Sequence, residues 1–227
     1  MYPLCDAGDQ PQVEVMNRSV LKSLAASRLA QVFCLVSLIF GAACTTPYDP
    51  LQDFAPVSPA TELEVPPTDA PRAEAYPTDQ LNQGRYMVGL LGCAICHTDG
   101  ALIGKPDYAL NLAGSGIGIA YTNPLVDHRP AVVFPPNITP DLETGIGRCS
   151  QGELVRLLRS GEADHGRHLL AVMPWPTYAS IKDSDALAIA AYLLSLPPVK
   201  HQVPDNVPVG AATRFPYVHF GVYRSRH

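Results

Sequence analysis

The feature that most constrains this chain is the short run Cys93-Ala94-Ile95-Cys96-His97. In a C-x-x-C-H motif, two thiols add across the vinyl groups of a haem and the adjacent histidine becomes the proximal ligand of its iron. A thioredoxin-like dithiol is one alternative, but it should lie in a βαβ pattern. Half of a four-thiolate zinc site is another, but it needs a second cysteine pair that this chain lacks. The motif therefore predicts one covalent haem c, around which the chain has to fold.

The N-terminus has the pattern of an export signal. The chain starts with acidic residues and no base, but basic residues follow Met16, so we take Met16 as the true start. The apolar run Val32–Ala43 is shorter than the roughly 18 residues needed to cross a bilayer. It ends Gly41-Ala42-Ala43-Cys44, which resembles the lipobox of bacterial lipoproteins, although that family usually has Leu at the position of Gly41. We expect residues 1–43 to be a removed signal peptide and Cys44 to carry lipid. The alternatives are an ordinary cleaved signal and an uncleaved anchor.

A proline-rich, acidic stretch follows over residues 44–78, with eight prolines and six acidic residues against the single base Arg72. Such a stretch cannot bury a core and favours an extended spacer of about 3 Å per residue. We expect a tether that holds a periplasm-facing domain near the membrane, or a protein secreted to the periplasm if no lipid is added. The chain has 16 basic and 21 acidic residues, so no basic excess favours nucleic-acid binding.

A single C-x-x-C-H motif leaves the second axial position of the iron to be filled from elsewhere. Met1 and Met16 belong to the segment expected to be removed. Met87 lies six residues before Cys93, on the expected proximal side, so Met173 is the candidate. The proline that follows Met173 disfavours helix there and favours an extended loop, and a thioether ligand raises the reduction potential and closes the iron to oxygen. The alternatives are a core role for Met173, with no sixth ligand or with a histidine from the set His128, His165, His168, His201 and His219.

Three helices are expected, over residues 79–92, 151–160 and 184–195. The first is expected to begin at a cap formed by Thr78 or Asp79. The second has the capping-box pair Ser150 and Glu153, with Gly161 as the expected C-cap. The first and third helices should cross. No convincing strand core is present, and residues 98–136 are expected to be a long loop wrapped around a large apolar cofactor.

The eleven residues from Asn137 to Gly147, NITPDLETGIG, carry a family resemblance. They are similar to the NITPD-x-x-TGIG stretch in c-type cytochromes of membrane-bound bacterial dehydrogenases, including the haem subunits that serve alcohol, aldehyde and gluconate dehydrogenases. The agreement continues in consistent order over residues 79–199, through Met173-Pro174 to Leu196-Pro197-Pro198-Val199. The resemblance implies a mainly α fold, namely a class I cytochrome c-like helical domain wrapped around one covalent haem, with long loops. Residues 200–227 would then be a C-terminal extension.

The same resemblance implies roles for individual residues. Cys93 and Cys96 would attach the haem, and His97 and Met173 would be its axial ligands. Tyr178 would lie near the haem propionates, and Arg167 is a second candidate for that position.

The chain also departs from this family. The well-known subunits have three such domains and this chain has one, so it resembles a single-haem relative. Cys149 stands where the family usually has an aromatic residue. We expect it to be a buried free cysteine that packs as a small hydrophobe. A redox-sensitive or haem-proximal thiol is the alternative.

These observations predict an electron carrier and no catalysis of its own. A monohaem cytochrome would pass single electrons between a membrane-associated dehydrogenase or cytochrome and a downstream carrier or oxidase. One alternative is a haem enzyme, a peroxidase or sulfur-compound oxidoreductase, in which Met173 is displaceable and Cys149 or a histidine acts in the pocket. Another is a ligand sensor or assembly factor with a structural haem. In a stable complex, the tether and the C-terminal extension would bind the partner.

Overall fold

The structure is a computed structural model, and it describes residues 54, 55, 57, 76–124, 126–162, 169, 170 and 172–221. The expected signal peptide, the lipid candidate Cys44 and most of the tether lie outside the described residues. Within the described ranges, no helix combines the length and the apolar character that crossing a bilayer requires.

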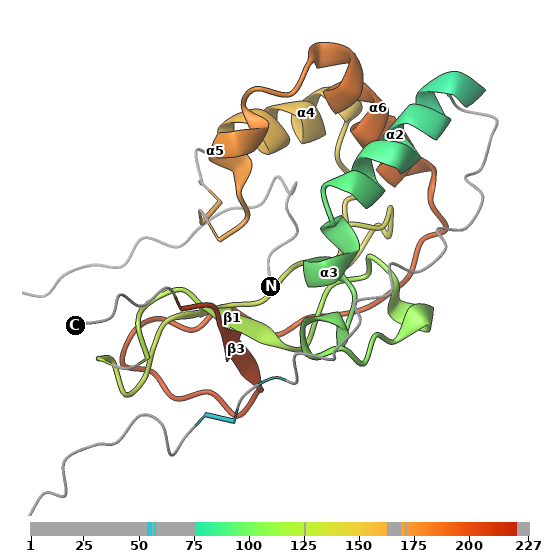
Figure 1. Cartoon of the computed structure of the whole chain (residues 1–227). Helices are drawn as coiled ribbons and strands as arrows, with labels where there is room; N and C mark the ends of the chain where they lie inside the picture. Colours follow the sequence, from blue (N-terminus) through green and yellow to red (C-terminus); the bar gives the residue numbers. More distant parts are fainter. Residues whose placement is uncertain are drawn as a thin grey trace, which may run out of the picture. The chain divides into compact units, whose positions relative to one another are not determined.

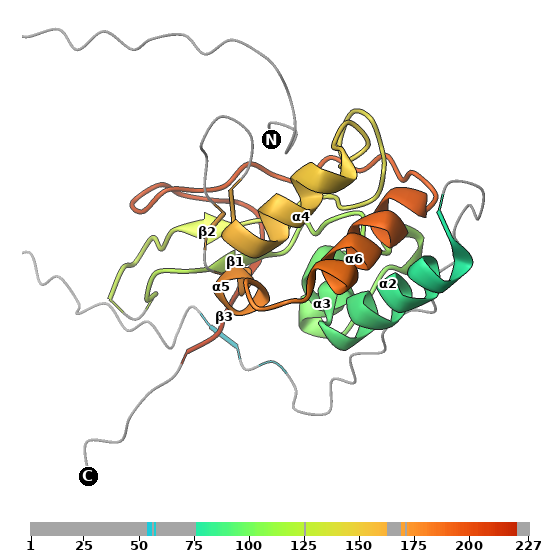
Figure 2. The same ribbon diagram turned by 90° about the horizontal axis from the view of Figure 1, so that it is seen from above.

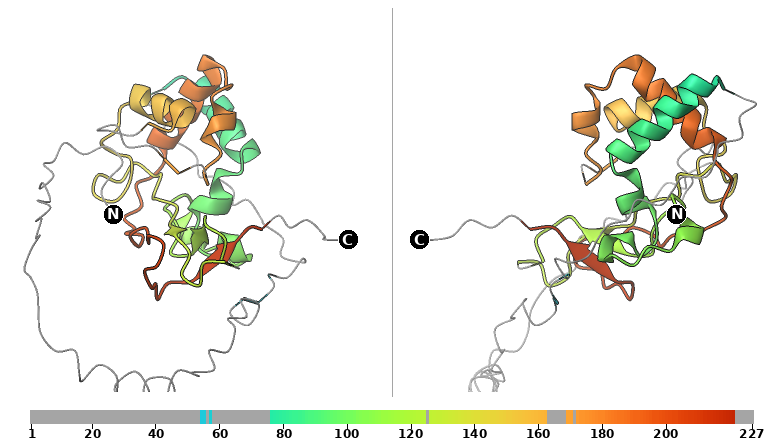
Figure 3. Two further views of the ribbon diagram at one scale, coloured as in Figure 1. Left: turned by 90° about the vertical axis from the view of Figure 1, so that its left-hand side faces the viewer. Right: turned by 45° about the vertical axis from the view of Figure 1, so that its right-hand side comes forward.

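Helices make up most of the regular structure, as predicted. They are α2 (Thr78–Leu90), α3 (Cys93–His97), α4 (Gln151–Ser160), α5 (Trp175–Tyr178) and α6 (Asp183–Ser195). The longer helices gather on one side of the domain and the strands on the other, with α3 between them (Figures 1 and 3). The three helices expected from the sequence are therefore confirmed to within two residues at each end.

The helix ends follow the expected chemistry at α4 but not at α2. The Ser150 side chain accepts from the Glu153 backbone, the Glu153 side chain accepts from the Ser150 backbone, and Gly161 closes the helix in the left-handed region, so these predictions are confirmed. The N-cap of α2 is Pro77, which makes no side-chain cap. The expected cap at Thr78 or Asp79 is therefore wrong, because both residues already lie within the first turn.

The crossing of α2 and α6 is confirmed, and a glycine makes it close. A Cβ placed on Gly84 would lie 2.1 Å from the Ala188 carbonyl oxygen and 2.6 Å from the Tyr192 Cβ. The two helices lie side by side in Figure 2. Because Gly84 lacks a side chain, the helix backbones approach until α6 is buried on most of its surface.

A small sheet was not expected. Strands β1 (Gly118–Ala120), β2 (Val132–Val133) and β3 (Tyr217–His219) are arranged in the order β2-β1-β3. β1 pairs antiparallel with β2 and parallel with β3, which comes from the expected C-terminal extension. These strands were missed because strands of two or three residues are too short to show an alternating pattern.

The expected loop over residues 98–136 contains β1, β2 and two short 3₁₀ helices, η2 (Ala101–Ile103) and η3 (Tyr108–Leu110). Ile119 of β1 packs with Val218 of β3 in a cluster that also contacts Cys96. Residues far apart in the sequence thus cover the region that follows the C-x-x-C-H motif.

Candidate functional site

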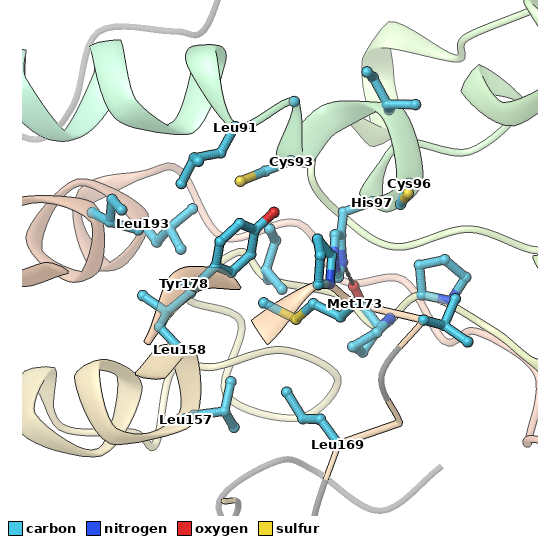
Figure 4. A pocket seen from close by; sticks show the side chains of 18 of the residues that line it. Leu91, Cys93, Cys96, His97, Leu157, Leu158, Leu169, Met173, Tyr178 and Leu193 are labelled. Carbon is cyan, nitrogen blue, oxygen red and sulfur yellow. Dashed lines mark hydrogen bonds between the residues drawn. The ribbon is translucent and has the colours of Figure 1, made fainter. Parts of the chain in front are cut away.

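Helix α3 presents all three polar residues of the motif. It begins after Gly92, whose φ of 66° turns the chain sharply away from α2. Cys96 and His97 lie three and four residues after Cys93, so their side chains lie within one helical turn of it. Both Cys93 and Cys96 are unbridged, and Figure 4 shows them with His97 at the wall of one pocket.

This pocket is a cavity of about 310 Å³ whose wall is almost entirely apolar. Leucine, isoleucine, valine and proline side chains supply most of the lining, and no aspartate, glutamate, lysine or arginine is among the described lining residues. Its volume lies at the small end of the range for cofactor sites, roughly 300–1,000 Å³. The wall includes the side chains Cys93, Cys96, His97, Met173 and Tyr178. The four site residues predicted from the sequence therefore meet in one cavity.

The imidazole of His97 is held in one tautomer. His97 is 9% exposed, and its Nδ1 lies 2.7 Å from the Pro136 carbonyl oxygen. A carbonyl only accepts, so Nδ1 carries the hydrogen and Nε2 keeps its lone pair. Burial lowers the pKa of His97 below its usual range, although the hydrogen bond to Pro136 opposes this shift. The ring is thus neutral, with one nitrogen available to a metal, which is the usual state of a ligating histidine.

The pKa values of the two thiols do not suit disulfide exchange. Burial raises the pKa of Cys93 to about 11, although a backbone hydrogen bond opposes this shift, and Cys96 adds a smaller increase. Burial also raises the pKa of Cys96. Reactive dithiols have a depressed pKa, so the thioredoxin-like alternative is not supported. Among the described residues, no group of three or more His, Cys, Asp or Glu side chains is placed to hold a metal ion.

Met173 lies in the bend before α5 and lines the cavity. Its side chain and that of His97 extend into the same space in Figure 4. The Trp175 backbone N–H donates to the Met173 carbonyl at 2.7 Å, and the Trp175 indole donates to the Leu169 carbonyl at 3.1 Å. Trp175 thus supports the segment that carries Met173, a role that sequence reasoning missed because it depends on a loop contact.

The alternative histidine ligands do not reach this cavity where they are described. His128 is exposed, His219 lies in β3, and the Nδ1 of His201 lies 2.9 Å from the Ala113 carbonyl oxygen. None of the three is among the lining residues. His165, His168 and the propionate candidate Arg167 lie outside the described residues.

Tyr178 lines the cavity. In Figure 4 its hydroxyl points toward Cys93. Burial raises the pKa of this phenol, and the nearby Cys93 and Cys96 raise it further. The contact of Tyr178 with a haem propionate stays a prediction.

Cys149 is 7% exposed and belongs to the main hydrophobic cluster, together with Ile146 and Leu154. Its burial is as expected. Cys149 is also not among the residues that line the cavity, which removes it as a pocket thiol.

Known proteins resemble this chain. It is 34% identical over 154 residues to a nicotinate dehydrogenase subunit of Pseudomonas putida, covering 68% of this chain and 11% of the relative. It is 31% identical over 149 residues to the gluconate 2-dehydrogenase cytochrome c subunit of Pantoea cypripedii, covering 63% and 30%. It is 32% identical over 124 residues to the cytochrome c subunit of alcohol dehydrogenase (quinone) of Gluconobacter oxydans, covering 54% and 23%.

No family model matches the chain. The chain spans less than a third of the length of each of these three relatives. The resemblance to cytochrome c subunits of dehydrogenases, which the NITPD stretch predicted, is confirmed.

Proposed function

The chain is a relative of the cytochrome c subunits of bacterial dehydrogenases, and from this premise we propose that it is a monohaem c-type cytochrome that carries single electrons. The observation that carries the proposal is the state of His97, whose Nδ1 is bound to Pro136 while its ring lines an apolar cavity beside two thiols. When bound, a haem supplies reversible one-electron chemistry at its iron. The donor would be a membrane-associated dehydrogenase or cytochrome, and the acceptor a downstream carrier or oxidase.

Each predicted site residue has one task in this proposal. Cys93 and Cys96 would hold the haem covalently, and His97, through Nε2, and Met173 would be the ligands of its iron. The apolar wall excludes water, and a low dielectric together with a thioether ligand favours the reduced form. No residue makes or breaks a bond in a substrate, so the chain would act as a carrier or as an electron-transfer subunit.

The location of the protein is part of the proposal. The signal pattern supports export to the periplasm, and the Gly41-Ala42-Ala43-Cys44 run supports lipid on Cys44. The proline-rich residues 45–78 would then tether the domain to the membrane and raise its local concentration near redox partners.

A haem enzyme would need a polar group beside the iron to act on a substrate. Apart from the proposed haem ligands, Tyr178 is the described lining residue that carries a polar side-chain group. Its hydroxyl is directed toward Cys93, and its raised pKa keeps it protonated. The structure therefore favours electron transfer over peroxidase or sulfur-compound chemistry.

Replacement of Met173 by alanine tests the proposal. The purified wild-type chain should show a low-spin haem c spectrum with the weak near-infrared band of sulfur ligation, and should not bind carbon monoxide when reduced. Met173→Ala should lose that band, bind carbon monoxide and have a lower midpoint potential. Met87→Ala is the matched control, because Met87 packs against the same hydrophobic cluster but does not line the cavity. A colourless wild-type protein, or an unchanged Met173→Ala spectrum, would contradict the proposal.

A further inference from the structure

We propose that Asn137 and Thr139 are positioning residues, which hold the Pro136 carbonyl against His97 and thereby set how strongly this imidazole binds iron. They do so through a buried set of hydrogen bonds to Val199, called here the Val199 clamp. The inference rests on the proposed function, because His97 has to be an iron ligand. It adds that Asn137 and Thr139, which do not line the cavity, tune the iron.

The Val199 clamp uses every polar atom of the Asn137 side chain. Its amide nitrogen donates to the Val199 carbonyl at 2.7 Å and to Thr144 Oγ1 at 3.0 Å. Its amide oxygen accepts from the Thr139 backbone at 2.9 Å and from Thr139 Oγ1 at 2.8 Å. The Val199 N–H in turn donates to Thr139 Oγ1 at 3.1 Å.

The clamp lies in the interior of the domain, where such bonds are strong. Asn137 and Thr139 are each 1% exposed. Unpaired polar groups at such a depth cost about 1–3 kcal/mol each, so the bonds persist and the segment they join is rigid. Val199 is 62 residues farther along the chain than Asn137. The clamp therefore ties the end of the helical domain to the NITPD stretch.

The fixed position of Asn137 also fixes the Pro136 carbonyl, which accepts the hydrogen bond from His97. The Pro136 carbonyl and the Asn137 nitrogen belong to one planar peptide unit, so fixing Asn137 restricts the carbonyl direction. The preceding carbonyl, on Pro135, accepts from the Ser115 N–H at 3.0 Å. Pro136 is thus held from both sides while its oxygen accepts from His97 Nδ1 at 2.7 Å.

Gly114 makes this close approach possible. A Cβ on Gly114 would lie 2.7 Å from the Asn137 nitrogen, and its φ is +89°. The Gly114 N–H also donates to the His97 carbonyl at 2.8 Å. The backbone and the side chain of His97 are therefore held by two neighbouring segments, and the clamp fixes one of them.

A hydrogen bond from Nδ1–H makes an imidazole a stronger ligand, and a stronger ligand favours oxidised iron. Loosening the clamp should therefore weaken the His97–Pro136 bond and raise the midpoint potential. A merely structural role would lower stability and leave the potential unchanged.

The test uses the full haem-loaded chain and two substitutions at one position. Thr139→Val removes the hydroxyl and keeps the branched shape, whereas Thr139→Ser keeps the hydroxyl. Redox dyes hold the sample at a fixed potential. There, Thr139→Val should increase the ratio of reduced to oxidised protein about two- to tenfold, which corresponds to the net free energy of one hydrogen bond. Thr139→Ser should stay near wild type. If Thr139→Val does not accumulate, Thr144→Val removes one of the two acceptors of the Asn137 amide nitrogen and carries the same prediction.

Ser195→Ala is the matched control, because it removes a buried hydrogen bond to the Tyr192 carbonyl at 2.7 Å that is not one of the bonds of the clamp. It should lower the melting temperature and leave the redox ratio unchanged. Equal ratios in Thr139→Val and Thr139→Ser, or an equal shift in Ser195→Ala, would overturn the inference. A wild-type protein without haem would instead overturn the proposed function itself, which separates the two failures.

Discussion

At the scale of single residues, Gly161 and Trp175 show how the wall near Met173 is held. The Leu169 N–H donates to the Gly161 carbonyl at 2.7 Å, and the Trp175 indole donates to the Leu169 carbonyl. A Cβ on Gly161 would lie 2.6 Å from the indole ring. The indole ring therefore packs against the Gly161 backbone at the end of α4. This contact helps to position the bend that carries Met173.

Gly161→Ala should therefore destabilise the domain more than Gly210→Ala. Both glycines have positive φ, 67° and 85°, but a Cβ on Gly210 would meet nothing within 4 Å. Gly210→Ala should cost about 1–2 kcal/mol from backbone strain alone. Gly161→Ala adds a clash with Trp175, for a further cost of about 1–3 kcal/mol. Denaturant unfolding of the two haem-loaded variants measures the difference, and equal losses would show that the Trp175 contact is not tight.

The residues of the site were largely predictable, but their supports were not. Cys93, Cys96 and His97 follow from a local motif, and Met173 follows from elimination among four methionines. Trp175 and Asn137 act through contacts that only the folded chain creates. The Asn137 bond to Val199 joins positions whose pairing has no local sequence pattern.

At the scale of elements, the helix pair α2 and α6 forms the rigid part of the fold. Gly84 lets the two backbones meet, and Tyr192 and Ile189 of α6 are fully buried. Leu193 and Ile189 of the same helix also line the cavity. The packing of α2 against α6 thus fixes one wall of the site.

Two glycine substitutions in α2 should have opposite effects. Gly84→Ala puts a methyl group into the Ala188 carbonyl and should destabilise the domain by about 1–3 kcal/mol. Gly89→Ala meets nothing within 4 Å and should stabilise it by about 0.5–1 kcal/mol, because alanine is the better helix former. Guanidinium unfolding of the two variants gives both values. A neutral Gly84→Ala would mean that the helices can separate at no cost.

The long helices were predictable because their apolar spacing and the α4 caps are local signals. The strands were not, since each has only two or three residues and β1 finds its parallel partner in residues 217–219. The stability of such short strands comes from tertiary packing and not from propensity.

At the scale of the whole molecule, the proposed protein has a membrane anchor at its N-terminus and a redox domain after it. We predict that the mature chain begins at Cys44 and that the mass of its N-terminal peptide includes a diacylglycerol group. Cys44→Ser should release the protein from the membrane fraction while it keeps its haem, because Cys93 and Cys96 are separate from the anchor. An unmodified N-terminus in the mass spectrum, or a Cys44→Ser variant that stays with the membrane, would contradict this prediction.

The parallel pairing of β1 with β3 places Gly118 opposite Tyr217. A protein secreted N-terminus first would present its C-x-x-C-H motif long before the last strand emerges. Both thiols would then be open to the machinery that joins porphyrin to protein, and the tail would close beside Cys96 only afterwards. Because of this order of residues along the chain, the haem would be attached before β3 pairs with β1.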